Sequence, residues 1–117
     1  MSQDQIEEQT VSNFRDLLLI LNNGTRLITR MIEDVTDEED KPIEDSYFMY
    51  EPHELIRLND GRLIMVKWIA ETTDKVIPIP IEEVLTAVHP DDDLLNYYLQ
   101  QIGVIPKPVE MPSQSVH

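Results

Sequence analysis

The sequence predicts a mainly β, antiparallel fold with a helix near each end of the chain. Two tight-turn signals, Asn22-Asn23-Gly24 and Asn59-Asp60-Gly61, each separate two runs rich in apolar and β-branched residues, a pattern typical of β-hairpins. Apolar residues at helical spacing between positions 94 and 102 predict a helix close to the C-terminus. With 117 residues, of which 41% are apolar, the chain suits one domain with one core.

The first hairpin joins an apolar run at 17–21 to a long strand predicted at 25–35. Its Asn-Gly sequence favours the positive φ angles of primed hairpin turns. In the second strand Arg26 and Arg30 share one face and Leu27 and Met31 the other, since side chains alternate across a strand. We therefore expect one face of this hairpin to enter the core and the other to remain partly solvated.

Three further strands are predicted at 46–58, 62–70 and 76–79. Pro52 interrupts the first of them, and because proline cannot donate to a ladder, we expect a bulge or bend there. The last is short and is bracketed by Pro78 and Pro80. Such a strand is expected at a sheet edge, where a neighbouring subunit can add.

Helices are predicted at 6–14 and at 91–102. The second begins at Asp91, whose acidic neighbours suit the positive end of the helix dipole, and it stops at Gly103. The stretch 82–88 is compatible with either strand or helix. We expect one domain over residues 1–103 and a disordered, proline-containing tail at 104–117.

The chain is strongly acidic, with 23 acids against nine lysines and arginines and a net charge of −14. This charge disfavours non-specific coating of nucleic acid. Eight of the acids, with one lysine, lie between positions 33 and 45, which predicts a solvated loop that projects from the sheet. The acids of this loop are consecutive and lack the glycine of an EF-hand, so a structural role is favoured over a weak divalent-cation site.

Catalytic motifs are missing from the sequence. The three glycines are assigned to two turns and a helix cap, which leaves none for a phosphate-binding loop. The histidines His53, His89 and His117 are scattered singly, and cysteine is absent, so neither a nucleophile with its base nor a thiolate metal site is expected. The prediction is a protein that is not an enzyme and that carries no cofactor and no metal.

The lack of cysteine and of any apolar run of membrane-spanning length indicates a cytoplasmic protein without membrane contact. The acidic N-terminus at 1–10 does not have the pattern of a signal peptide.

The basic residues concentrate on the predicted strands, away from the acidic loop. This segregation can leave a locally positive surface on a negative protein. The candidate nucleic-acid-binding residues are Arg26, Arg30, Arg57, Arg62 and Lys67 for phosphates, with Tyr50 and Trp68 as stacking surfaces. The alternative is that the cations pair with acids across strands and that the aromatic rings belong to the core.

The order helix, strand, Asn-Gly turn, long strand, variable loop and three further strands resembles the Sm-like fold. The best local match is the apolar strand, glycine turn and long strand at 17–35, and the pattern extends over about 14–88. More narrowly, the chain resembles Sm-like proteins of marine cyanophage origin. The resemblance implies a strongly bent five-stranded antiparallel barrel, a homo-oligomeric ring joined by edge strands, binding of RNA or DNA, and the cytoplasm of an infected host cell.

The chain departs from the Sm-like pattern at both RNA-binding signatures. The loop after the long strand has no Asp-x-φ-Asn pattern, and Thr73-Asp74-Lys75 has no glycine after its cation. No RNA-contacting residue is therefore carried over from the family, and the C-terminal helix is an addition to its usual fold. The second function hypothesis is an acidic oligomeric scaffold that recruits a protein partner through the acidic loop and the tail.

Overall fold

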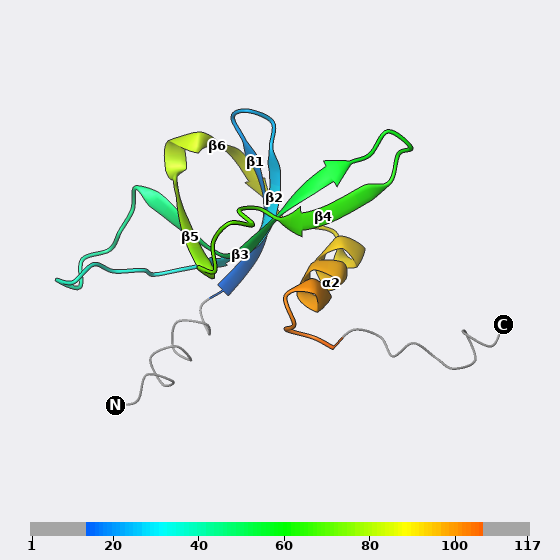
Figure 1. The fold of residues 1–117 in the computed structure, drawn as a ribbon. Helices are drawn as coiled ribbons and strands as arrows, with labels where there is room; N and C mark the ends of the chain where they lie inside the picture. Colours follow the sequence, from blue (N-terminus) through cyan, green and yellow to red (C-terminus); the bar gives the residue numbers. More distant parts are fainter. Residues whose placement is uncertain (1–13, 107–117) are drawn as a thin grey trace.

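A computed structural model describes residues 14–106 of the chain. The helix predicted at 6–14 lies outside these residues except for Phe14, which begins a strand, and the tail from 107 onward lies outside them as well. The fold is mainly β, a six-stranded antiparallel sheet with one C-terminal helix (Figure 1). The elements in chain order are β1 (Phe14–Leu21), β2 (Arg26–Ile32), β3 (Ser46–Arg57), β4 (Leu63–Lys67), β5 (Val76–Pro80), the short 3₁₀ helix η1 (Ile81–Glu83), β6 (Val84–Val88) and α2 (Asp92–Gln101).

The sheet has six strands where five were predicted, because residues 84–88 form β6. The strand order is β4-β3-β2-β1-β6. Strand β5 pairs with the first half of β3, and β4 pairs with the second half. The last strand, β6, therefore lies beside the first, β1. Within the described residues the sheet is not closed, since β5 and β6 are joined by η1 without a ladder between them.

Both hairpin turns lie where the glycines predicted them. Leu21 and Thr25 close the first turn with a backbone hydrogen bond of 2.8 Å, and Gly24 has a φ of 90°. The residues with positive φ do not include Asn23, so the turn is not the primed type that was predicted, which requires positive φ at both positions. It is a three-residue loop with glycine at the left-handed position.

The predicted core face of β2 is confirmed, but the arginine face is less solvated than predicted, because Ile28 and Ile32 on it are buried and Arg30 is half-buried. Leu27 and Met31 are buried and join the core, while Arg26 is exposed. The main core cluster is built from side chains of β1, β2, β3 and β5 and comprises Leu17, Leu19, Leu21, Leu27, Met31, Met49 and Ile79. Strand β2 ends at Ile32, three residues earlier than predicted, and Asp34 beyond it has a φ of 59°, which is incompatible with a continued strand.

The bend predicted at Pro52 is confirmed, and it lies in the middle of β3. Glu51 has a φ of 50°, and the pairing register between β2 and β3 shifts between Ile28 and Arg30. A shift of this kind removes backbone groups from the ladder. These groups need other partners, because buried backbone donors and acceptors are almost always hydrogen-bonded.

Tyr98 of α2 supplies the missing hydrogen bonds at the bend. Its ring is fully buried, and its hydroxyl accepts from the Arg30 amide at 3.1 Å. The same hydroxyl lies 2.8 Å from the carbonyl oxygen of Tyr50 and 2.9 Å from that of Glu51, toward which it can donate. The helix is thus fixed to the bend by one side chain, which also packs edge-on against the ring of His53.

Helix α2 has the ends that the sequence predicted. The Asp91 carboxylate accepts from the Leu94 amide at 2.8 Å as an N-cap. After the last turn, Gly103 has a φ of 82°, and the Val104 amide donates to the Leu99 carbonyl, as in a Schellman motif. In the part of the chain that the structure describes, no helix has the length and the apolar character needed to cross a membrane.

Burial raises the pKa of the Tyr98 hydroxyl because the phenolate would lose its hydration, and the Arg30 amide offsets only part of this effect. In the unfolded chain the group should titrate near its ordinary pKa of about 10. Below that pH both states hold the proton, so the folded state loses nothing. Above it only the unfolded state releases the proton, and stability falls as the pH rises.

We therefore expect the stability difference between wild type and Tyr98→Phe to be constant up to a pH of about 10 and then to shrink by up to roughly 1.4 kcal/mol per pH unit. Urea unfolding from pH 8 to pH 11 measures this difference. A difference that stays constant over the whole range would show that the Tyr98 hydroxyl titrates normally in the folded state.

Candidate nucleic-acid interface

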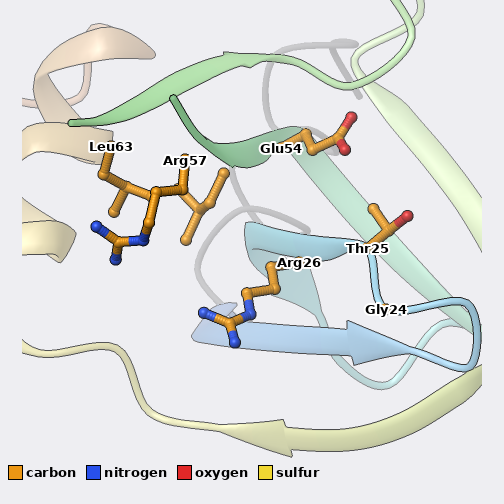
Figure 2. Close-up of a pocket in the computed structure, with 7 residues that line it drawn as sticks. Gly24, Thr25, Arg26, Glu54, Arg57 and Leu63 are labelled. Atoms are coloured by element: carbon orange, nitrogen blue, oxygen red, sulfur yellow. The ribbon is translucent and has the colours of Figure 1, made fainter. Parts of the chain in front are cut away.

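A pocket of about 260 Å³ lies between the first hairpin turn and the outer half of β3 with β4. The turn positions Arg26 at the start of β2, and the strand that follows the bend positions Arg57 at the end of β3. Figure 2 shows both guanidinium groups extending to the same side, with the Glu54 carboxylate directed away from them. The remaining lining residues are Gly24, Thr25, Leu55 and Leu63.

The charges of Arg26 and Arg57 are not balanced by acids in the described part of the chain. Both side chains belong to exposed residues, and within residues 14–106 neither forms an ion pair with a carboxylate. Arg57 donates once, to the Gly61 carbonyl at 2.8 Å, which leaves its other N–H groups for a ligand. Two guanidinium groups on one side of a pocket suit a phosphate, which they can bind in bidentate geometry.

Arg62 and Lys67 lie near this pocket but do not line it. Arg62 pairs with Asp60 at 2.8 Å. The backbone amide of Arg62 and then its guanidinium hold the pKa of the Asp60 carboxyl below its ordinary value. Lys67, at the end of β4, donates to the Thr72 carbonyl at 2.8 Å. Both cations thus have local partners.

Arg30 is not brought to the pocket, although it shares the face of Arg26. Its guanidinium pairs with Asp16 on β1 at 2.8 Å and lies over the Phe14 ring, 4.6 Å from the ring centroid. Arg30 therefore follows the alternative prediction, in which a cation pairs with an acid on the neighbouring strand.

The two aromatic candidates are also placed away from the pocket lining. The half-buried ring of Tyr50 packs against Phe14 at a centroid distance of 5.6 Å. Trp68 is partly buried and packs against the core cluster. Of the seven sequence-predicted residues, the structure brings Arg26 and Arg57 together in one pocket.

Sequence reasoning did not single out Thr25, Glu54, Leu55 and Leu63, which also line the pocket. Thr25 follows directly from the turn at Gly24, and that position was a usable signal. Glu54 and Leu55 reach the pocket because β3 changes direction at Glu51, and no local sequence pattern gives the direction of that bend.

The outer edge of β5 offers few backbone donors to a further strand. The Glu51 amide donates to the Lys75 carbonyl at 2.7 Å. Because alternate residues direct their backbone groups to opposite edges, Ile77 and Ile79 also face β3, while Val76, Pro78 and Pro80 face outward. The two prolines therefore leave Val76 as the one outward amide donor of β5.

The outer edges of β4 and β6 contain no proline. The Trp68 amide donates to the Pro52 carbonyl on β3, so by alternation Leu63, Met65 and Lys67 turn their amides outward. On β1 the Leu21 amide donates to Thr25 on the β2 side, so by alternation Leu18 and Ile20 turn their backbone groups toward β6. Their partners Val88 and Thr86 therefore direct their backbone groups to β1, and Ala87 directs its own to the outer edge. The β6 surface is also apolar and solvated, with Leu85 68% and Val88 43% exposed.

Comparison of the sequence with models of known protein families and with curated proteins finds no match to this chain.

Proposed function

We propose that this protein is a non-enzymatic, ring-forming Sm-like protein that binds single-stranded RNA or DNA at the pocket of Arg26 and Arg57. The observation that carries the binding part is the pair of exposed guanidinium groups on one side of that pocket, without carboxylate partners among residues 14–106. Phosphodiester oxygens are the ligands that such a pair recognises.

The distribution of charge supports this proposal despite the net charge of −14. Eight acids lie in the loop 33–45, which projects from the sheet on the side away from the β3–β4 hairpin (Figure 1). None of these acids lines the pocket of Arg26 and Arg57. A backbone contact with two phosphates is therefore compatible with a protein that repels polyanions elsewhere.

The bend of the sheet supports the Sm-like part of the proposal. β3 turns at Glu51 and Pro52 so that β5 pairs with its first half and β4 with its second. β6 lies beside β1, so the last strand of the chain pairs with the first, as expected for a strongly bent sheet of this kind.

The strand edges support a ring in which the β6 edge of one subunit pairs with the β4 edge of the next. Such a contact joins two different surfaces, and repeated rotation closes it into a ring. A ring would repeat the Arg26 and Arg57 pocket once per subunit, and several weak contacts to one strand then combine into a useful affinity.

Ala87→Pro is expected to convert the oligomer into monomers, because it removes an outward amide of β6 that β1 does not use. Val76→Pro is the matched control, since it removes the outward amide of β5 and should leave the oligomer intact. Light scattering after size-exclusion chromatography measures both masses. A wild-type chain that is already monomeric at high concentration, or equal effects of the two variants, would contradict pairing through β6.

The binding proposal is tested by titrating wild-type protein into fluorescently labelled single-stranded RNA and DNA at low and moderate salt. We expect saturable anisotropy changes and a binding constant that falls as salt increases, because phosphate contacts release counterions. Lack of binding to both probes even at low salt would overturn the nucleic-acid assignment.

A further inference from the structure

A second hollow, of about 320 Å³, lies at the base of the acidic loop, between the end of β2, the start of β3 and η1. Its apolar and aromatic lining residues, which we call the floor, outnumber the polar ones, and Ile81 among them is 39% exposed. Among the apolar lining residues Met31 and Ile32 are buried, and the others are only partly covered, namely Val35, Ile43, Tyr47, Phe48 and Ile81. An apolar surface of this kind beside polar residues marks an interaction site. We call it the loop-base groove.

The rim of the loop-base groove is negative. Glu33, Asp34 and Glu44 line it, with Arg15 as the one cation among the lining residues. Arg15 is neutralised by Glu33, with a nitrogen-to-oxygen distance of 2.9 Å. Within residues 14–106, Asp34 and Glu44 form no ion pair.

The adjoining loop adds to this negative potential. Of the eight acids between positions 33 and 45, Glu39 pairs with Lys41, the loop's one lysine, at 3.5 Å. The groove therefore combines an apolar floor with uncompensated carboxylates on one side of the molecule.

This combination selects among occupants. A nucleic acid would be repelled, since its phosphates carry the same sign as the rim. A metal ion would need converging ligands, and the described residues contain no group of three or more that could hold one. What complements both the floor and the rim is a cationic ligand with apolar side chains.

We propose that the loop-base groove binds a basic peptide segment of another protein, in which lysines or arginines flank one or more large apolar side chains. The apolar side chain packs on Ile81 and the partly exposed apolar side chains beside it, and the flanking cations meet Asp34 and Glu44. This site shares no lining residue with the Arg26 and Arg57 pocket, so it stands independently of the nucleic-acid function and binds a ligand of opposite charge.

The test uses the full-length protein and three labelled peptides of equal length, followed by fluorescence anisotropy near physiological ionic strength. One peptide alternates lysine and leucine around a tryptophan, one is oligolysine, and one carries glutamates in place of the lysines of the first. We expect the first to bind about tenfold or more tighter than oligolysine, and the acidic peptide not to bind.

Two pairs of matched variants locate the site. Glu44→Lys, on the groove rim, should weaken the first peptide about tenfold, whereas Glu71→Lys, an exposed acid outside the groove, changes net charge equally and should have little effect. Ile81→Ala should weaken binding, and Val104→Ala, which shortens an exposed apolar side chain outside the groove, should not. The second pair of variants measures the contribution of apolar contacts to peptide binding, because neither substitution changes the charge.

Equal affinity for oligolysine and the mixed peptide, or equal effects of Glu44→Lys and Glu71→Lys, would mean general charge attraction and would overturn the proposal. It would also fall if no peptide bound and Ile81→Ala instead lowered the mass of the oligomer, because the groove would then be a subunit interface. Neither result depends on whether the protein binds nucleic acid.

Discussion

Tyr98→Phe is expected to lower the free energy of unfolding by about 2–3 kcal/mol, although it removes a single oxygen atom. That oxygen is the partner of the Arg30 amide and lies within hydrogen-bonding distance of the Tyr50 and Glu51 carbonyls. All of these groups lie at the bend, where the pairing register between β2 and β3 shifts. Without the hydroxyl, the Arg30 amide loses its acceptor, whereas the Tyr50 carbonyl keeps the Thr29 hydroxyl and the Glu51 carbonyl keeps the His53 ring nitrogen nearby. A buried amide without an acceptor is costly.

Tyr97→Phe is the matched control, because the neighbouring ring is 46% exposed and its loss of a hydroxyl should change stability by less than about 0.5 kcal/mol. Urea unfolding followed by the fluorescence of Trp68 compares the two variants. If both variants shift the midpoint equally, Tyr98 does not hold the helix to the bend.

The second large effect is expected from reversing the charges of the candidate interface. Arg26→Glu combined with Arg57→Glu should weaken binding of single-stranded nucleic acid by about a hundredfold or more, since each charged hydrogen bond contributes roughly 1.5–3 kcal/mol. Both residues are exposed, so the fold should tolerate the change. Anisotropy titration at low salt measures the loss.

Arg15→Glu combined with Lys41→Glu changes the net charge by the same amount at exposed positions outside the pocket. This control should bind nearly as well as wild type if the contact is local. Equal weakening by both double variants would indicate that total charge, and not the Arg26 and Arg57 pocket, governs binding.

Local chemistry made the turns and the C-terminal helix predictable. Gly24, Gly61 and Gly103 all have positive φ, and the Asp91 cap is decided by its own side chain and the first turn of the helix. Likewise the bend of β3 was predictable from Pro52, because proline has no backbone N–H to donate to a neighbouring strand, whatever the rest of the fold.

Features that depend on distant residues were not predictable in the same way. Tyr98 was visible only as one member of an apolar helical stripe, whereas its role depends on backbone groups of β2 and β3. Residues 84–88 form a strand because β1 offers them an edge, with Leu18 pairing Val88. Their own sequence did not decide between strand and helix.

The candidate site was predicted in part for the same reason. The arginines on strands could be listed from the sequence, but whether each meets an acid depends on cross-strand register, which pairs Arg30 with Asp16. Arg26 lies opposite Ile20 instead, and this register leaves it without an acid directly across the hairpin. The bend then brings the Arg57 end of β3 to the same pocket.

The salt dependence of nucleic-acid binding by wild type, Arg26→Ala and Arg57→Ala tests the central claim most directly. If both arginines contact phosphates, the slope of log Kd against log salt should fall by about 0.7 for each arginine removed from a single-strand contact. The Arg15→Ala variant should keep the wild-type slope. Unchanged slopes for Arg26→Ala and Arg57→Ala, with binding intact, would contradict the assignment of this pocket as the nucleic-acid interface.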